Sequence, residues 1–416
     1  MLDDKIKQIF NNYPDTSSMK QLKDALLDQI HLFVNHELRE GKTLQEAELK
    51  AEKNLKGLNK FIQQVNQQEN DTLDKVELNK FLAKTFGLKL VNEFKIPLSG
   101  IDELHFNYRL GDLLIWPSPN QDHLIVRDFM SRDIAKLYST IEKVGNVIKI
   151  TQGPKKLVGL FKNKIIILLP TNYTGFLTIR SQSGSVTFNH LDQKCLLDIT
   201  DISGNVILRN SNIDRLQADS KSGDISLLNS KINDCHVNIH SGNIMINNTQ
   251  IHPTNGELSL SSTSGKINLT NISTKRLLIN SKSGNIVGQN VTASLTEIAT
   301  DSGNIKLDNF ISAGQFDTKS GKIKLTLPAS FDRDLKINSH SGNVKILTSE
   351  NFEFQFLLTV KSGNIDLPMD AILYAEDNYD QFKGYVGSEN TKCQLDITTK
   401  TGKINISNKS TKKREL

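Results

Sequence analysis

Hydrophobic and polar positions of the second half of the chain follow a pattern that returns at a nearly constant spacing. Each return centres on a Ser-Gly or Thr-Gly step followed by a branched apolar residue. From the first glycine to the tenth, nine intervals span 179 residues, a mean of 19.9 per repeat. The eleven glycines are Gly184, Gly204, Gly223, Gly242, Gly265, Gly284, Gly303, Gly321, Gly342, Gly363 and Gly402.

Four positions around each glycine are apolar in nearly every repeat. The second residue after it is Val or Ile in all eleven, and the fourth is apolar except at Gly288. The fifth residue before it is always apolar, and the seventh is apolar except at Thr296 and Gly314. Successive side chains of a strand point to opposite faces, so this spacing of two predicts strands with one buried face. Each repeat thus predicts a strand, a Ser-Gly corner and a second strand.

Repeats of this kind predict stacking, because one coil cannot bury its apolar face alone. We expect the glycine to supply a positive φ at the corner, and the Ser or Thr before it to bond neighbouring backbone amides. A third apolar site, with a drifting offset, indicates a looser corner; it includes Ile213, Ile232 and Ile251. The predicted fold is mainly β, a single-chain β-solenoid of stacked coils preceded by a small three-helix domain. A sandwich of hairpins is the alternative, but it gives no reason for one register over all repeats.

The N-terminal residues, 1–65, predict a helical bundle. Apolar stripes predict helices over residues 3–12 and 17–40, and Thr43-Leu44-Gln45-Glu46 reads as a capping box that opens a third helix. We expect this third helix to extend as far as Phe61 and Val65. Residues 66–100 are then a linker containing an amphipathic basic segment at 72–86, which either caps the solenoid or lies on a membrane surface.

The β-repeat domain is predicted over residues 101–408 and a basic disordered tail over 409–416. Irregular strands precede the first Ser-Gly step, among them Val147–Ile150 and Ile165–Pro170. The last interval, from Gly363 to Gly402, is twice the usual length, so we place one degenerate coil at Gly384 and an insertion at residues 368–379. The tail could touch anionic lipid, but such ends are commonly solvated.

Charge and cysteine content exclude several classes of protein. Lys and Arg number 51 against 46 Asp and Glu, a net charge of +5, and the first hundred residues hold 15 of each sign. With part of the excess in the basic tail, no face for nucleic acid is predicted. Three cysteines without CxxC spacing (Cys195, Cys235 and Cys393) indicate neither a disulfide framework nor a metal site.

Two segments resemble known bacterial families. The stretch His36–Thr43 followed by Glu46-Ala47 resembles the helical signalling or permease-prefix domains of Gram-positive bacteria, over about residues 1–62, although Gly57-Leu58-Asn59 departs from their pattern. The strands from 101 and the repeated Ser-Gly-Asn-Ile phrases resemble the bacterial adhesin-like β-repeat family, over about residues 100–408. These resemblances imply a link to the cell envelope and its stress response.

No catalytic set is found in the sequence. Acid-base cleavage of a sugar needs two carboxyls flanking one bond, and the pairs Asp198/Asp201 and Asp332/Asp334 are isolated. His31 and His36 are five residues apart and share no helix face. Asparagines directly after the repeat glycines, such as Asn205 and Asn343, indicate a structural ladder between coils. We therefore predict no catalytic, cofactor-binding or metal-binding residues, and no cofactor.

The predicted function is that of a non-enzymatic interaction protein of the bacterial cell envelope. The helices would dock a protein partner, and the β-repeat domain would offer a surface for protein, peripheral membrane or cell-wall polymer. The alternatives are a surface adhesin and a carbohydrate-active β-helix enzyme. The N-terminus lacks the order of a signal peptide and no apolar run is long enough to span a membrane, so the expected location is cytoplasmic or peripherally membrane-associated, with the cell surface as an alternative.

Overall fold

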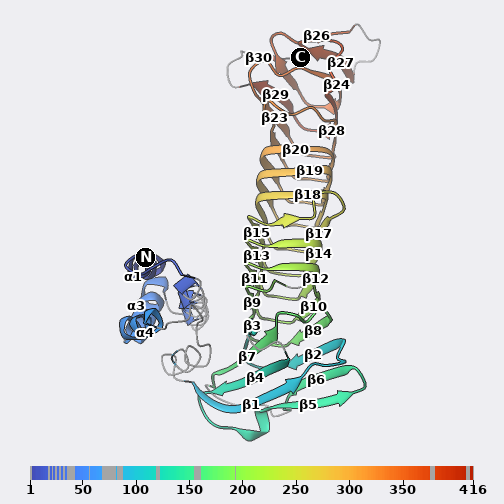
Figure 1. Cartoon of the computed structure of the whole chain (residues 1–416). Helices are drawn as coiled ribbons and strands as arrows, with labels where there is room; N and C mark the ends of the chain where they lie inside the picture. The colour runs from blue at the N-terminus through green and yellow to red at the C-terminus, as the bar shows by residue number, and fades with distance from the viewer. Residues whose placement is uncertain are drawn as a thin grey trace. The chain divides into compact units, whose positions relative to one another are not determined.

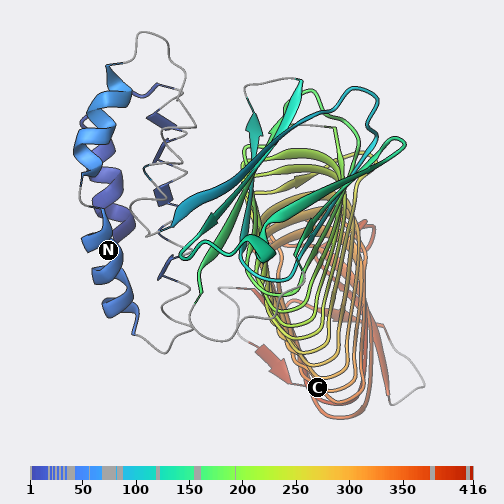
Figure 2. The ribbon, with the colours of Figure 1, turned by 90° about the horizontal axis from the view of Figure 1, so that it is seen from below.

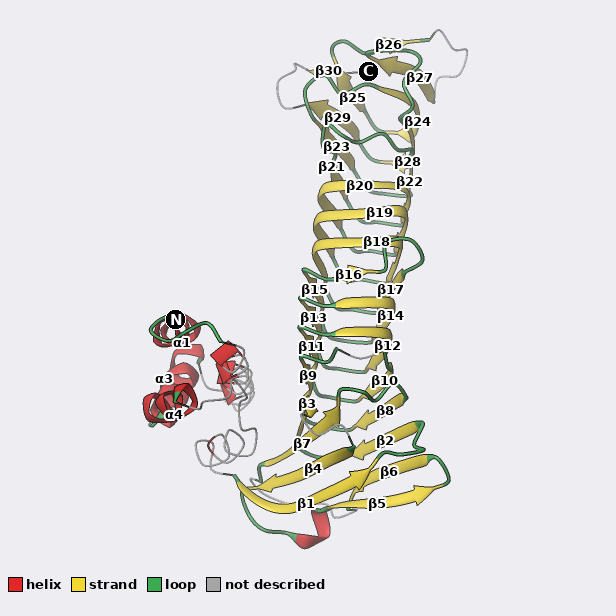
Figure 3. Cartoon of the chain, in the orientation of Figure 1, coloured by secondary structure: helices red, strands yellow, loops and turns green. Residues whose placement is uncertain are grey.

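The chain is mainly β, with its helices near the N-terminus (Figure 3). The computed structural model describes residues 2–16, 19–20, 22–23, 26–27, 30, 33–34, 43–55, 57–67, 81, 88–118, 122–153, 161–192, 194–374, 380–408 and 413–415. The chain divides into two compact units. The first comprises Met1–Phe94, Val126–Ser139 and Gly153–Ile166, and the second comprises Lys95–Ile125, Thr140–Gln152 and Ile167–Leu416.

The helices of the first unit follow the predicted stripes. They are α1 (Leu2–Phe10), α3 (Leu44–Asn54) and α4 (Leu58–Asn66). The capping box is confirmed, since the Thr43 hydroxyl accepts from the Glu46 amide at 3.3 Å and the Thr43 amide donates to the Glu46 carboxylate at 2.9 Å. The expected extension of the third helix to Val65 is wrong. The chain turns at Gly57, whose φ of +92° interrupts the helix, and α4 begins after it.

Two other predictions for this region, at residues 17–40 and 72–86, fall mostly on residues that the structure does not describe. Of the helix predicted over 17–40, the described residues are helical, and Met19, Leu22 and Ile30 are buried. The amphipathic segment at 72–86 lies outside the described residues, apart from Phe81.

The predicted linker at 66–100 contains a strand, so regular β structure begins earlier than expected. The first strands and the short 3-10 helix are β1 (Lys89–Pro97), β4 (His123–Met130), η1 (Ala135–Leu137), β5 (Ser139–Val144) and β7 (Asn163–Pro170).

The second unit stacks the strands before the repeat glycines into one parallel ladder (Figure 1). In stacking order, these strands are β6 (Val147–Gln152), β2 (Glu103–Tyr108), β8 (Phe176–Ser181), β10 (Leu196–Asp201), β12 (Asn212–Ser220), β14 (Lys231–Ile239), β17 (Glu257–Ser262), β18 (Ile267–Ser281), β19 (Ile286–Thr300), β20 (Ile305–Thr318), β22 (Leu335–Ser339), β28 (Gln394–Thr401) and β24 (Phe354–Ser362).

The strands after the glycines form a second parallel ladder, to which the first halves of β18, β19 and β20 also belong. Its other strands are β3 (Asp112–Ser118), β9 (Val186–Asn189), β11 (Val206–Arg209), β13 (Ile225–Leu228), β15 (Ile244–Asn247), β21 (Ile323–Thr326), β23 (Val344–Thr348), β29 (Ile404–Asn408) and β25 (Ile365–Pro368), while the short β16 (Gln250–Ile251) pairs at the third apolar site. Figure 2 shows these coils one behind another.

Register and burial confirm the predicted apolar positions. Ile225, two residues after Gly223, pairs with Val206 of the preceding coil and with Ile244 of the following one. All three side chains are fully buried. Like residues therefore stack on like residues through the centre of the unit, and the core is continuous along it.

From the sequence, the repeat glycines were expected to supply a positive φ at the corner, but the structure shows a different reason for them. Most of them, from Gly204 to Gly342, do not have a positive φ. Instead, consecutive corners approach so closely that a Cβ on Gly223 would lie 1.4 Å from the carbonyl oxygen of Gly204, and one on Gly265 would lie 1.3 Å from that of Gly242. The glycine is required by the contact between coils, and its conformational freedom is secondary.

Two hydroxyl columns complete this corner. The serine before the glycine was expected to bond amides, but it donates to a carbonyl of the preceding coil, as Ser222 does to Ile202 at 3.0 Å. A buried Ser or Thr three residues before the glycine accepts from the glycine amide; Ser281 does so from Gly284 at 3.1 Å. These bonds recur in most coils, so they give polar backbone groups of the corner partners within the protein.

At the next corner, six residues after the glycine, the residue with positive φ is an asparagine in six successive coils and His190 in the coil of Gly184. These asparagines have φ between 48° and 55°, and the side-chain amide of each donates to an asparagine of the preceding coil; the ladder consists of Asn210, Asn229, Asn248, Asn271, Asn290 and Asn309. Asparagine tolerates this conformation better than other residues with a Cβ. The ladder predicted directly after the glycines also joins coils, but through backbone donors, as when the Asp224 amide donates to Asn205 Oδ1 at 3.0 Å.

One coil precedes those that the sequence revealed. Gly111 lacks a preceding serine, yet a Cβ on Gly184 would lie 2.1 Å from its carbonyl oxygen, so the two corners stack as the later ones do. Beyond this coil lies β6, whose buried Gln152 accepts from the amides of Arg109 and Leu110 at 3.0 and 2.9 Å and donates to the Leu110 carbonyl at 3.0 Å. A side chain thus supplies the hydrogen bonds that a further corner would supply.

At the other end, the coils do not stack in chain order. Strand β28 lies between β22 and β24, because Leu395 pairs with Leu335 on one side and with Phe356 on the other. The coil of Gly402 is therefore inserted between those of Gly342 and Gly363, in contrast to the expected sequence order. The degenerate coil predicted at Gly384 is also wrong. That residue belongs to β27 (Gln381–Val386), which pairs antiparallel with β24 and with β26 (Ile372–Leu373).

The basic tail differs from the prediction in its described part. Residues Lys413–Glu415 form β30, which pairs antiparallel with β25. Disorder was expected from the charge and terminal position of this segment. Pairing with a strand at the end of the ladder gives its backbone groups partners that a free tail would lack.

Candidate functional site

Three of the four carboxylates considered in the sequence, Asp201, Asp332 and Asp334, have structural partners. Asp201 is buried and accepts from the Gly204 amide, in the place that Ser or Thr occupies in other coils. Asp332 pairs with Arg333 at 3.1 Å, and Asp334 accepts from the Gln394 amide at 2.9 Å, which ties the inserted coil to its neighbour. The structure does not bring these residues together as an acid-base pair.

In the described part of the chain, no three His, Cys, Asp or Glu side chains lie close enough to hold a metal ion. Among the same residues, no helix is long and apolar enough to span a membrane. The absence of catalytic, cofactor and metal sites stays a prediction from the sequence, and His31 and His36 lie outside the described residues.

The three cysteines are free and buried in the second unit. Burial raises the pKa of Cys195 and of Cys393 to about 12, and it raises the pKa of Cys235 further. Only the thiolate is an effective nucleophile. These side chains are therefore small core residues and not a reactive centre.

We expect none of the three thiols to react with a disulfide reagent at pH 8 in the folded protein, and all three to react in urea. The pKa values of the folded thiols are above the unfolded value of about 8.5. Below that pH the thiols add no pH dependence to the free energy of unfolding, and above it they lower that free energy as the pH rises. Counting released thiolate with and without urea checks this. Rapid modification of the native protein would contradict the burial of the thiols.

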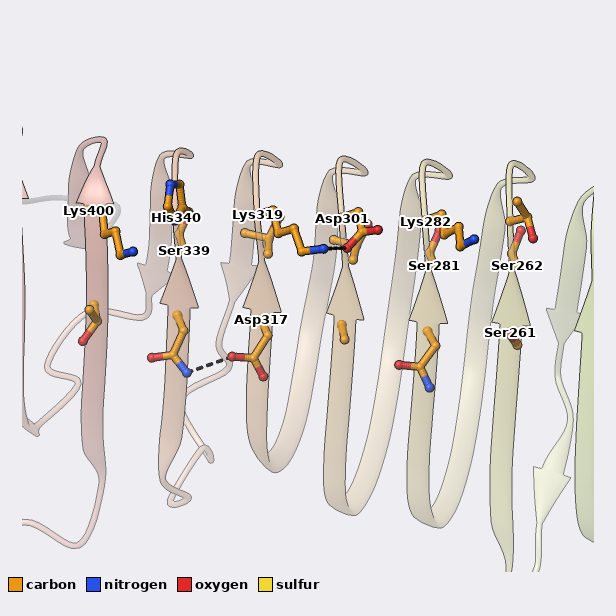
Figure 4. Close-up of a pocket in the computed structure, with 17 residues that line it drawn as sticks. Ser261, Ser262, Ser281, Lys282, Asp301, Asp317, Lys319, Ser339, His340 and Lys400 are labelled. Atoms are coloured by element: carbon orange, nitrogen blue, oxygen red, sulfur yellow. Dashed lines mark hydrogen bonds and ion pairs between the residues drawn. The ribbon is translucent and has the colours of Figure 1, made fainter.

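A groove runs along the outer side of the first ladder, over six consecutive coils, and encloses about 560 Å³ (Figure 4). One of its rows lies four residues before the glycines and is mostly of amides and hydroxyls: Ser261, Asn280, Ala299, Asp317, Asn338 and Thr398. The other lies two residues before the glycines and is mostly charged: Thr263, Lys282, Asp301, Lys319, His340 and Lys400. The buried hydroxyls between them hold the corners, so both rows are fixed by the stacking.

The charges of the groove are partly paired. Lys319 contacts Asp301 at 2.7 Å, across one coil, and Asn338 donates to Asp317 at 2.8 Å. Among the described residues, Lys282 and Lys400 have no ion-pair partner. The groove therefore offers ammonium, amide and hydroxyl groups at a regular spacing, which is suited to hydrogen bonding with an extended polar molecule.

Sequence reasoning did not find this groove, because its residues are far apart in the chain. The repeat spacing does place them in two rows once the coils are aligned. Lys400 joins the groove only because its strand is inserted next to β22, and nothing in the local sequence indicates that neighbour.

Stacked parallel coils with a polar outer groove define a repeat protein. The chain belongs to the Toastrack DUF4097 family, whose model matches residues 135–256 and 253–407. No curated protein matches the chain.

Three solved structures illustrate the likeness. A candidate cell adhesion protein from Clostridium sporogenes is 12% identical, with 77% of this chain and 100% of that one covered and a TM-score of 0.20. Candidate adhesins from Parabacteroides merdae and Parabacteroides distasonis are 12% and 13% identical, with 76% of this chain and 95% and 97% of those chains covered and TM-scores of 0.29 and 0.31. These values are too low to carry an argument about function.

Proposed function

We propose that the chain is a non-enzymatic binding protein, in which a β-solenoid presents its outer groove to an extended polar partner. The observation that carries this proposal is the groove itself: the same two outward positions recur over six stacked coils. The inward positions are occupied by the core, so the chemistry available to a partner lies on the outer columns.

The form of the groove favours an elongated partner over a small molecule. It is open and follows the stack, with successive coils spaced by about 4.8 Å. Small-molecule sites are in general enclosed cavities or clefts, whereas this groove crosses six stacked coils and presents the same two residue positions in each of them. A cell-wall polymer or an extended protein segment would contact several coils at once.

The link to the bacterial envelope and its stress response rests on the sequence resemblance, as does docking of a protein partner by the N-terminal helices. On this proposal the protein is cytoplasmic or at the membrane periphery if its partner is a protein segment, and at the cell surface if its partner is a wall polymer. A surface adhesin is the second candidate, favoured by the resemblance of the repeats to the adhesin-like family. Protease treatment of intact cells separates the two, because only a surface-exposed protein would be cleaved.

We expect Ala299→Trp to abolish binding to an insoluble Gram-positive cell-wall preparation. Ala299 is a small residue in the middle of the groove, so an indole there blocks the groove without removing a core contact. The measurement is co-sedimentation with the wall preparation, where a loss of at least tenfold is expected, that is, about 1.4 kcal/mol.

The matched control is Ser226→Trp, on an outward position of β13 in the other ladder. It should sediment like the unmodified protein. Equal binding by both tryptophan variants would show that the groove is not the contact surface. Cleavage of the wall polymer by the protein, lost on a single Asp substitution, would instead support the carbohydrate-active enzyme.

A further inference from the structure

A second charged feature lies on the other ladder. Lys306, Lys324 and Lys345 are in register on β20, β21 and β23, three consecutive strands. Their neighbours along each strand are buried, so the three side chains point outward. We call these three residues the lysine ladder.

The lysine ladder opposes stability within the chain. Neighbouring strands are about 4.8 Å apart, and like charges directly opposite each other in a sheet destabilise it. Lys306 contacts Asp308 at 3.0 Å. Within the described residues, no ion pair joins Lys324 or Lys345 to a carboxylate. Lys324 and Lys345 thus have no ion pair of their own in the described part of the chain, although the Asp308 carboxylate also attracts Lys324.

The pKa of the Asp308 carboxyl responds to the positive charges of the lysine ladder. Burial raises the pKa of its carboxyl, but hydrogen bonds from Lys306 and Thr326 and the charges of Lys306 and Lys324 outweigh burial and hold that pKa below its ordinary value. This carboxylate stays ionised, and its hydrogen bonds from Lys306 and Thr326 occupy it. It does not neutralise the ladder as a whole.

The surroundings of the ladder are also suited to an anion. Lys322 lies directly after the glycine of the same coil as Lys324, and Asn304 and Asn343 hold that position in the coils on either side. The column that contains the ladder is uncharged in the four preceding coils, where it holds Ser226, Met245, Asn268 and Val287. In the two coils after Lys345 it holds Asn405 and Asp366, so the positive charge of this column is confined to three coils.

We propose that the lysine ladder binds a linear polyanion that runs along the stack and places its charges against successive lysines. The three lysines lie in register on consecutive strands of one face, so a polymer with repeated charges can contact all of them at once. This inference rests on the proposed binding function for its use of the repeats as a platform, but it assigns a different face and a definite chemistry. Phosphodiester or phosphate polymers and polyuronates share that chemistry.

The test compares two triple variants with the same change in charge. Lys306→Gln/Lys324→Gln/Lys345→Gln removes the ladder, and Lys231→Gln/Lys275→Gln/Lys336→Gln removes three exposed lysines elsewhere. Binding to fluorescent inorganic polyphosphate and to polygalacturonate is measured against salt concentration. We expect at least a tenfold loss for the ladder variant only, and a decrease of about 2 in the slope of log affinity against log salt. The polymer that binds more tightly identifies phosphate or carboxylate as the preferred group.

Other outcomes overturn the inference. Equal weakening of both variants would show a general effect of net charge, and binding to anionic lipid vesicles but to neither polymer would show a lipid surface instead. Thermal unfolding of both variants controls for folding, and the ladder variant should be no less stable than the unmodified protein. If Ala299→Trp alone abolishes polyanion binding, the ladder is not the site, while the proposed binding function stands.

Discussion

Replacing Gly265 with alanine is expected to unfold the coils around it. The new Cβ would lie 1.3 Å from the carbonyl oxygen of Gly242 and 2.5 Å from its carbonyl carbon. Both atoms belong to the backbone, which is held by ladders on each side, so no flexible side chain can give way. We expect a loss of about 4 kcal/mol or more in the free energy of unfolding, measured by urea denaturation followed by circular dichroism.

Two further variants separate the close contact between coils from other causes of this loss. Ser264→Ala removes only a hydrogen bond to His240, so it should cost about 1 kcal/mol. Gly265→Asn tests conformation, because asparagine tolerates a positive φ. If the corner required only such a φ, the asparagine variant would be almost as stable as the unmodified protein. If the Gly265→Ala and Ser264→Ala variants unfolded at the same urea concentration, the close contact between coils would be refuted.

Deleting residues 394–416 is expected to destabilise the whole C-terminal part of the second unit. These residues form β28 and β29, which lie between strands on both sides. Their removal takes away an interior coil and leaves the apolar faces of β22 and β24 without their partner. We expect the unfolding temperature to fall by several degrees, as a loss of about 2–3 kcal/mol in the free energy of unfolding would produce. We also expect rapid proteolysis over residues 354–393.

The control for this deletion removes only residues 409–416, so β28 and β29 stay in place. It should cost little, because β30 contributes three residues of pairing at the edge. If the coils stacked in chain order, the longer deletion would only shorten the stack, and residues 354–373 would stay protected from protease. That result would contradict the inserted position of β28.

The repeated core could be predicted because its physics is local and periodic. Two apolar positions on each side of a glycine specify two strands and the corner between them, and their recurrence specifies the stacking. Ile225 and Ile244 are buried and paired as that pattern requires. Gly111 was missed because its corner lacks the serine, although Leu113 and Ile115 occupy the two buried positions that follow.

The order of the last coils could not be predicted. Gly363 and Gly402 carry the same phrase, so either coil fits against Gly342 by its apolar positions alone. The choice depends on contacts between distant segments, such as the antiparallel pairing of β24 with β27. The groove and the lysine ladder were missed for a related reason: outward positions are free of packing constraints, so their chemistry becomes visible only when coils are aligned.

The antiparallel strands at the C-terminal end of the second unit also bear on solubility. A parallel, in-register stack is the geometry of an amyloid fibril, and an open end would recruit further chains. Here the last parallel strands meet β27 and β30, which run in the opposite direction, and the outermost strands β26 and β30 are only two and three residues long. A second molecule finds no long parallel template there, so the protein can carry a fibril-like interior and still resist end-to-end polymerisation.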